Sequence, residues 1–400
     1  MKRVALGLSL VLLVGCGSDD SGGSGGAAGA GASGGSGASG GGAAAGSGGG
    51  GAGTSGSAGG GAGGLAGSAG NAGTAGGSGN GGTSGGGSGG QGSGGTGAGG
   101  TGGSGTGGGS GFVPAYPGQA APGMLLWGAA VQGNADPASR HEIPAGHVLT
   151  VHRTFFQWAQ RTTSMITMAK GDIQNKRVPW VSVKTPSWDA MGKGQHDAEI
   201  DQMLKALDAI QGPIWLTIHH EPEGGGASGN TPDDPAGPAG HVAMNKRVRE
   251  RMTALKVDNI ALAPILMSYT WNPASGRNPD AWYAPEIYDF VGIDHYRDAE
   301  ASLLTNVWAT VRTWASKRQM DIAIGEWGVR GTNQAAGQRV HEWYDHAAGS
   351  NKDGKGARVV GLAAFDSGLN SPSGSWELTG EQLKAFQALL NDPRTATVVP

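Results

Sequence analysis

The sequence predicts a (β/α)8 barrel, an α/β fold, over residues 112–400, and three observations support this prediction. Short apolar runs alternate with segments of helical periodicity, which is typical of βα units around a parallel sheet. The apolar runs number eight, as one barrel requires. Residues 112–400 also contain every Phe, Tyr and Trp of the chain, so they can build one large core of this size.

The eight candidate strands are short and rich in aliphatic and aromatic residues. They are Leu125–Val131, Val148–Phe155, Val178–Lys184, Ile214–His220, Ile260–Met267, Phe290–Asp294, Ile322–Gly325 and Val359–Phe365.

Helices are expected between these strands, where apolar residues recur three or four positions apart. In Asp197–Ile210 this spacing involves Ile200, Met203, Leu204, Leu207 and Ile210. Similar patterns predict helices over Val242–Leu255, Leu303–Lys317, Ala335–Ala347 and Glu381–Leu390.

Residues 1–16 have the pattern of an export signal. Lys2 and Arg3 precede the apolar run Val4–Val14, which is too short to span a bilayer as a mature helix. The run ends in Leu13-Val14-Gly15-Cys16, which resembles the lipobox of bacterial lipoproteins. The resemblance implies cleavage before Cys16 and lipidation of that residue. The alternative is an ordinary secretory signal with an incidental cysteine.

Cys16 is the only cysteine, so no disulfide within the chain is expected. Gly17 and Ser18 follow it, where an Asp would favour retention in the inner membrane. We therefore expect a lipoprotein at the outer membrane or surface of a Gram-negative cell, held to the membrane through the N-terminal lipid alone.

Residues 17–111 consist almost entirely of Gly, Ser, Ala and Thr, and Leu65 is the one large aliphatic residue among them. Such a composition cannot bury enough apolar surface to form a core, so we predict a flexible, disordered linker. The formal net charge of −3 gives no basic surface for nucleic acid. We expect a monomer without a nucleic-acid partner.

Polar and aromatic side chains gather where the predicted strands end, which is where (β/α)8 barrels place their chemistry. The candidates in strand order are His152 and Arg153; Lys184, Thr185 and Trp188; His219, His220, Glu221 and Glu223; Tyr269 and Trp271; Asp294, His295, Tyr296 and Arg297; Glu326 and Trp327; and Asp366.

Two glutamates form the candidate catalytic pair. Glu221 follows the fourth candidate strand and Glu326 follows the seventh, and these strands face each other across the barrel. Retaining glycoside hydrolysis uses two carboxyl groups about 5–5.5 Å apart, one as nucleophile and one as acid/base. A carboxylate that follows an apolar strand is costly to bury unless it serves a site. The pair is therefore typical of a glycosidase active site.

The segments around these glutamates resemble clan A of the glycoside hydrolases. Within that clan, His220-Glu221 and Gly325-Glu326-Trp327-Gly328 resemble family 26, which is best known for β-mannanases. The resemblance implies that Glu221 is the acid/base and Glu326 the nucleophile. It also implies that His220 supports Glu221 and that Tyr296 donates a hydrogen bond to the nucleophile.

The chain departs from the family pattern at two places. The family usually has His-Glu-Met/Leu-Asn-Gly after the fourth strand, whereas this chain has Pro222, Glu223 and Gly224 after Glu221. The clan often has a Trp after the eighth strand, whereas this chain has Phe365-Asp366. The glycan therefore stays open between mannan, β-glucan and xylan types, and the cleavage between endo and exo.

Further side chains are expected to bind the polysaccharide or oligosaccharide substrate. Arg153, Trp188, Trp271 and Trp327 join His220 and Tyr296 in this set, because Trp faces stack on pyranose rings. Trp127 and Trp376 offer similar faces. Packing in the core is the alternative for each Trp, and an ion pair with Asp136 or Glu326 is the alternative for Arg153.

Other structural roles compete with the catalytic ones. Glu221 could instead pair with Arg153 or Lys184, Glu326 could cap a loop, and Glu223 could take the acid role. His219 is expected to pack within the barrel. Asp294 and Asp366 are expected to form hydrogen bonds at the strand ends.

Two other functions fit a barrel of this kind. His152, His219, His220, His241 and His295 could indicate a metal-dependent hydrolase, but such barrels generally carry His-x-His on the first strand and Leu125–Gly133 has no His. A carbohydrate-binding barrel without catalysis would be expected to lack one carboxylate, and both are present. We expect a glycoside hydrolase of polysaccharide degradation that needs no metal or cofactor.

Overall fold

The computed structural model describes residues 112–224, 232–297, 300–352, 354–368 and 375–398. Within them a parallel sheet has the strand order β5-β4-β3-β2-β1-β9-β8-β7-β6. Its strands are β1 (Leu126–Val131), β2 (Val151–Gln157), β3 (Val178–Lys184), β4 (Ile214–Ile218), β5 (Ile260–Leu262), β6 (Ile265–Met267), β7 (Val291–Arg297), β8 (Ile322–Val329) and β9 (Val359–Asp366).

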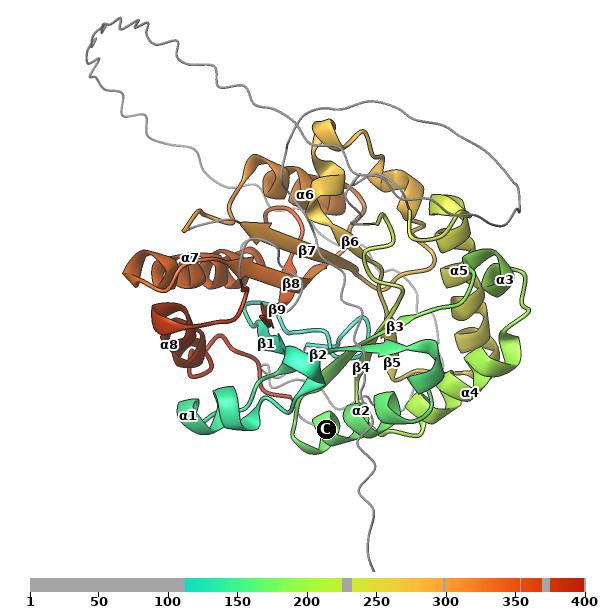
Figure 1. Ribbon diagram of the computed structural model, residues 1–400, viewed down its shortest axis with the longest axis horizontal. Helices are drawn as coiled ribbons and strands as arrows, with labels where there is room; N and C mark the ends of the chain where they lie inside the picture. The colour runs from blue at the N-terminus through green and yellow to red at the C-terminus, as the bar shows by residue number, and fades with distance from the viewer. Residues whose placement is uncertain (1–111, 225–231, 298–299, 353, 369–374, 399–400) are drawn as a thin grey trace, which may run out of the picture. The chain divides into compact units, whose positions relative to one another are not determined.

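The two ends of this sheet are halves of one strand. β5 pairs with β4 and β6 pairs with β7, and only Ala263 and Pro264 separate β5 from β6. Pro264 has no N–H for the ladder, yet its carbonyl accepts from the amide of Gly292 at 2.8 Å. The sheet therefore closes into an eight-stranded barrel, and the predicted (β/α)8 fold is confirmed (Figure 1).

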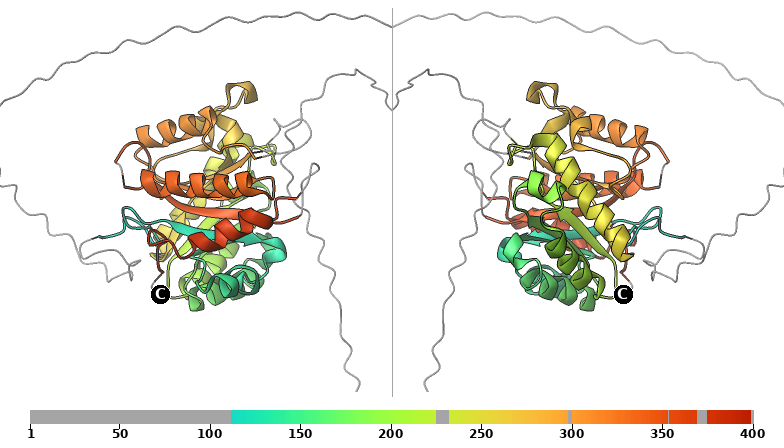
Figure 2. Two further views of the ribbon diagram at one scale, coloured as in Figure 1. Left: turned by 90° about the vertical axis from the view of Figure 1, so that its left-hand side faces the viewer. Right: turned by 90° about the vertical axis from the view of Figure 1, so that its right-hand side faces the viewer.

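Helices surround the strands, as Figures 1 and 2 show. They are α1 (Ile143–Ala145), α2 (Ser164–Gln174), α3 (Trp188–Gly192), α4 (Asp197–Asp208), α5 (Gly237–Leu255), α6 (Asn306–Lys317), α7 (Gln334–Ser350) and α8 (Gly380–Leu389). The five predicted helical segments correspond to α4, α5, α6, α7 and α8, with shifted ends.

Helix α2 was not among the predicted helices. Its polar residues and Gly171 weaken the apolar periodicity of this segment. Met165, Ala169 and Ile173 are nevertheless buried at intervals of about one helical turn. The predicted fifth strand, Ile260–Met267, is broken at Pro264 for the reason given above.

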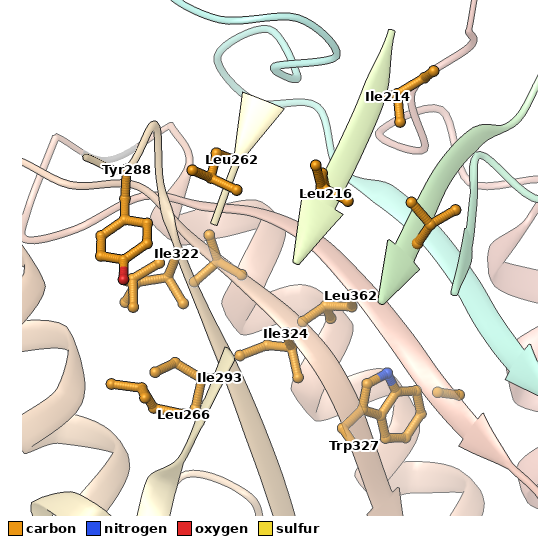
Figure 3. Packing of buried hydrophobic residues seen from close by; sticks show 14 of the residues in the cluster. Ile214, Leu216, Leu262, Leu266, Tyr288, Ile293, Ile322, Ile324, Trp327 and Leu362 are labelled. Carbon is orange, nitrogen blue, oxygen red and sulfur yellow. The ribbon is translucent and has the colours of Figure 1, made fainter. Parts of the chain in front are cut away.

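Side chains alternate between the inside of the barrel and the helix layer. Inside, Trp180, Trp215 and Phe290 pack against one another with ring centroids 4.5–5.7 Å apart and fill the end where the strands begin. Outside, Leu216, Ile293 and other buried strand residues pack against the helices (Figure 3). The open end of the interior is therefore where the strands finish, which we call the mouth.

The predictions for residues 1–16 and 17–111, the export signal with Cys16 and the linker, lie outside the described residues. In the part of the chain that the structure describes, no helix combines the length and apolarity needed to cross a membrane.

Candidate active site

Three carboxylates from three strand ends meet at the mouth. One side-chain oxygen each of Glu221, Asp294 and Glu326 lies within 4.8 Å of the other two. All three residues are buried, with 6 %, 2 % and 6 % of their surface exposed. The predicted pair is thus brought together, and Asp294, which was expected only to form hydrogen bonds at a strand end, is a third member of the cluster.

The turn after β4 aims Glu221 into the barrel through an unusual backbone. His219 and Glu221 have φ angles of 58° and 47°, in the left-handed region that costs a non-glycine residue about 1–2 kcal/mol. The amide of Glu221 donates to the carbonyl of Ile265 at 2.9 Å, which fixes the turn against β6. Strain of this kind persists where surrounding contacts hold it, often at functional sites.

A bulge in β8 aims Glu326 into the barrel. Ile293 pairs with Ile324, but the next residue, Asp294, pairs with Glu326, so Gly325 is the extra residue. A Cβ at Gly325 would lie 2.8 Å from Oδ1 of Asp294, so Gly325 also faces inward. Because the bulge shifts the alternation by one residue, Glu326 faces the site and its neighbour Trp327 faces the helices.

Tyr296 and Arg153 hold Glu326. The Tyr296 hydroxyl donates to Oε2 of Glu326 at 2.6 Å. Nη2 of Arg153 lies 3.9 Å from Oε1 of the same carboxylate, and Arg153 is fully buried. The Arg153 guanidinium also lies over the ring of Phe155, 4.4 Å from its centroid. These contacts orient the carboxylate and favour its ionised form.

The surroundings of Glu221 and Glu326 affect their pKa values differently. Burial raises both. At Glu221 the negative charges of Glu326 and Glu223 add to the rise, and its pKa lies well above the usual range. At Glu326 the charge of Arg153 and the hydrogen bond from Tyr296 oppose the rise. Glu221 is therefore the better proton donor and Glu326 the better anion.

His219 and His220 flank the site as neutral imidazoles. Burial lowers the pKa of His219 and holds that of His220 well below its usual range. Trp188 donates to Nδ1 of His219 at 3.0 Å, so the proton of that ring is on Nε2, which faces Asp233 at 3.0 Å. The ring of His220 lies 5.2 Å from that of Phe155. These contacts place both residues in the wall of the mouth.

Lys184 adds a cation at the same rim. Its Nζ lies 2.6 Å from Oδ2 of Asp233 and 3.2 Å from Nε2 of His219. Its charge lowers the pKa of Glu221 and of Glu326, although other causes outweigh it. Lys184 thus pairs with Asp233 while it supports the ionised form of the carboxylates.

The structure places three of the predicted substrate-binding tryptophans in packed surroundings. Trp327 has no exposed surface and stacks on Trp127, with centroids 5.4 Å apart, within the layer that Figure 3 draws. Trp188 is fully buried beside His219. Trp271 is 5 % exposed and packs edge-on against Trp314. The structure thus corrects these expectations, because strand alternation or neighbouring rings cover their faces.

Other aromatic rings line the mouth instead. Phe155, Phe365 and Tyr296 are half-buried, and Phe365 lies within 6.3 Å of the other two rings. Trp376 lies 4.7 Å from Tyr296. Phe155 and Tyr296 stand two positions after Arg153 and Asp294. Because residues two apart on a strand point to the same side, this spacing could have indicated that both rings point into the barrel.

Three of the histidines that suggested a metal site are engaged elsewhere. His152 Nδ1 lies 2.8 Å from Asp172, His241 Nε2 lies 3.3 Å from the carbonyl of His219, and His295 contacts Ser268 and the carbonyl of Leu303. Among the described residues, the carboxylate cluster at the mouth includes no imidazole.

No family model and no curated protein matches the sequence. Among solved structures, the chain is similar to a modular endo-β-1,4-mannanase from Cellulomonas fimi, with 14 % identity, 69 % of this chain and 72 % of that chain covered, and a TM-score of 0.48. It is similar to a family 26 β-mannanase from Bacteroides ovatus, with 13 % identity, 69 % of this chain and 90 % of that chain covered, and a TM-score of 0.46. It is also similar to the family 26 domain of an endo-β-mannanase/endo-β-glucanase from Prevotella bryantii, with 12 % identity, 68 % of this chain and 90 % of that chain covered, and a TM-score of 0.46.

Proposed function

We propose that residues 112–400 form a retaining glycoside hydrolase in which Glu326 is the nucleophile and Glu221 the acid/base. The observation that carries the proposal is the approach of these two carboxylates to within 4.8 Å. Retaining enzymes hold the two groups about 5–5.5 Å apart, whereas inverting enzymes separate them by about 6.5–9.5 Å to admit a water.

The reaction proceeds in two displacements. Glu326 attacks the anomeric carbon while Glu221 gives its proton to the leaving oxygen, so the glycosidic bond breaks and a glycosyl-enzyme ester forms. Glu221, now ionised, takes a proton from a water molecule that attacks the same carbon and releases Glu326. Tyr296 and Arg153 hold the nucleophile in place during both steps.

The substrate is a β-linked polysaccharide or oligosaccharide of the mannan, glucan or xylan type. Half-buried rings of Phe155, Tyr296 and Phe365 at the mouth support this class, because aromatic surfaces pack against the apolar faces of pyranoses. Mannan is the first polymer to test, since His220-Glu221 resembles the family 26 segment. Sizing of the products distinguishes endo from exo cleavage.

The test separates the two glutamates by the step in which each acts. Glu326→Ala should reduce turnover by about 10³-fold or more on every substrate, because no ester forms without the nucleophile. Glu221→Ala should be severe on polysaccharide and milder in the first step on an aryl glycoside, whose leaving group needs no proton. Azide should restore turnover of Glu221→Ala with a β-glycosyl azide as product, and give the α product with Glu326→Ala.

Other outcomes would exclude the double displacement or favour another function. Inverted configuration in the wild-type product, or the same response of both variants to azide, would exclude the double displacement. Activity that a chelator removes and a divalent metal restores would favour a metal-dependent hydrolase. Glycan binding without any turnover would favour a non-catalytic carbohydrate-binding barrel.

We further propose that the chain is a lipoprotein attached to the outer membrane through Cys16, with residues 17–111 as the linker to the barrel. The lipobox resemblance and the Gly-rich composition support this proposal. Cys16→Ser should abolish acylation and move the protein from the envelope to the soluble fraction. An unchanged amount of the Cys16→Ser protein in the envelope fraction would contradict it.

A further inference from the structure

Glu223 is a buried acid that the proposed reaction does not use. It lies two residues after Glu221 and has 1 % of its surface exposed. Its Oε1 accepts a hydrogen bond from the amide of Met267 at 3.0 Å and another from the hydroxyl of Thr270 at 2.6 Å. Both donors belong to the next βα unit, at the end of β6 and in the 3-10 helix η4 (Ser268–Trp271).

The turn that holds Glu221 needs such an anchor. His219, Glu221 and Gly224 all have φ between 47° and 75°, so three of six consecutive residues have left-handed backbone. Arg277, in the loop that follows η4, supports the same turn. Its Nη2 donates to the carbonyl of Gly224 at 2.9 Å. The Glu223 carboxyl ties this strained turn directly to η4 through Thr270.

We propose that Glu223 is a positioning residue that holds Glu221 in place for proton transfer by tying the turn after β4 to the start of η4. The inference rests on the proposed function, and it concerns a residue at which the chain departs from the family 26 pattern. Glu223 does not touch the substrate in this role; it acts through Glu221.

The charge of Glu223 also reaches the site. Burial raises the pKa of Glu223 to about 7, and the hydrogen bond from Thr270 and the charge of Arg277 oppose the rise. The negative charge of Glu223 in turn raises the pKa of Glu221 and of Asp294. An ionised Glu223 therefore favours the protonated form of the acid/base.

Two variants separate the tether from the charge. Glu223→Gln keeps an oxygen that can accept from Met267 and Thr270 but cannot ionise, whereas Glu223→Ala removes both properties. Glu250→Gln is the control, because Glu250 is an exposed acid on α5, paired with Arg247. The control should show wild-type activity and pH dependence.

Glu223→Ala should lower kcat on polysaccharide by about tenfold or more. It should reduce the rate of the first step on an activated aryl glycoside much less. Glu223→Gln should restore most of kcat, and its alkaline limb of kcat/KM should move to lower pH by about 0.5–1 unit. Equal losses of Glu223→Ala on both substrates would show that the residue serves folding alone, and an unchanged alkaline limb in Glu223→Gln would show that its charge does not act on Glu221.

The inference can also fail or hold independently of the glycosidase proposal. If the wild-type protein cleaves no glycoside, the titration of Glu221 can be followed by NMR on the full chain labelled with carbon-13 at glutamate carboxyls, with Glu221→Gln to assign the signal. A lower Glu221 pKa in Glu223→Gln than in wild type supports the electrostatic effect of Glu223 on Glu221. An identical pKa overturns it.

Discussion

The hydroxyl of Tyr296 donates a hydrogen bond to Oε2 of Glu326 at 2.6 Å. The donor stands on β7 and the acceptor on β8, so two neighbouring strands fix the orientation of the carboxylate. Burial and the charge of Glu326 hold the pKa of Tyr296 well above its usual range, so the hydroxyl keeps its proton. The bond favours the ionised form of Glu326, which a nucleophile requires.

Tyr296→Phe should therefore raise the pKa of Glu326, because the hydrogen bond that lowers it is removed. Glu326, the proposed nucleophile, then ionises at higher pH, and the acidic limb of kcat/KM should move to higher pH. The loss of a hydrogen bond to a charged group, about 1.5–3 kcal/mol, corresponds to roughly 10–100-fold in kcat/KM. Steady-state rates from pH 4 to pH 9 are the measurement, over about the range in which enzymatic carboxyls titrate.

Tyr288→Phe is the matched control, since Tyr288 is 5 % exposed and its hydroxyl has no hydrogen-bond partner among the described residues. It should leave the pH profile unchanged. An acidic limb that stays at the wild-type pH in Tyr296→Phe would contradict the assigned contact.

Gly325→Ala should disturb the bulge that turns Glu326 inward. The new Cβ would lie 2.8 Å from Oδ1 of Asp294 and 2.8 Å from Cδ1 of Ile265, so both must move. Overpacking of this kind costs about 1–3 kcal/mol of unfolding free energy. Activity per folded molecule should fall as well, and denaturant unfolding with rate assays on the same samples would show both effects.

The control for this variant is Gly349→Ala, in α7, where a Cβ would meet no atom within 4 Å. An alanine in a helix loses less backbone entropy on folding than glycine, so this variant should gain about 0.5–1 kcal/mol. A stable and fully active Gly325→Ala protein would argue against the bulge.

Trp327→Phe should reduce stability without changing substrate affinity. The ring packs on Trp127 in the helix layer and has no exposed surface, so a smaller ring leaves a gap worth about 1–3 kcal/mol. Thermal unfolding measures the loss. A rise in KM with unchanged stability would instead restore the substrate-binding role that the sequence predicted.

Glu223→Gln should change how stability depends on pH. The pKa of Glu223 is about 7 in the folded protein against an ordinary value of 4.5, so the folded state binds this proton more tightly than the unfolded state. The unfolding free energy contributed by this group is then greatest below pH 4.5 and is lost as the pH rises to 7, by up to about 3 kcal/mol. The wild type should lose this amount relative to the Gln variant.

Urea unfolding at pH 5 and at pH 8 measures the difference. The Gln variant should gain stability relative to the wild type on going from the lower to the higher pH. A difference between the two proteins that is the same at both pH values would indicate that Glu223 ionises as an exposed carboxyl does.

The sequence by itself determined the barrel and the pair of strand ends that carry the glutamates. Alternating apolar and helical segments give the order of βα units, and eight units in one chain close into one barrel. The position of Glu221 after the fourth strand and Glu326 after the seventh follows from the same count.

Only the tertiary structure decided which side chains face the site. Glu326 and Trp327 are adjacent, and alternation allows only one of them to point inward. The bulge at Gly325 determines which one does, and a single extra residue in a ladder depends on pairing with β7 that the local sequence does not encode.

The same holds for the charges around Glu221. Glu223 follows β4 and Glu326 stands on β8, and their effect on the pKa of Glu221 arises from burial and proximity in the closed barrel. Sequence patterns report which residues can ionise, whereas the energy of an ionised group depends on the solvent and charges around it. Those are properties of the folded chain.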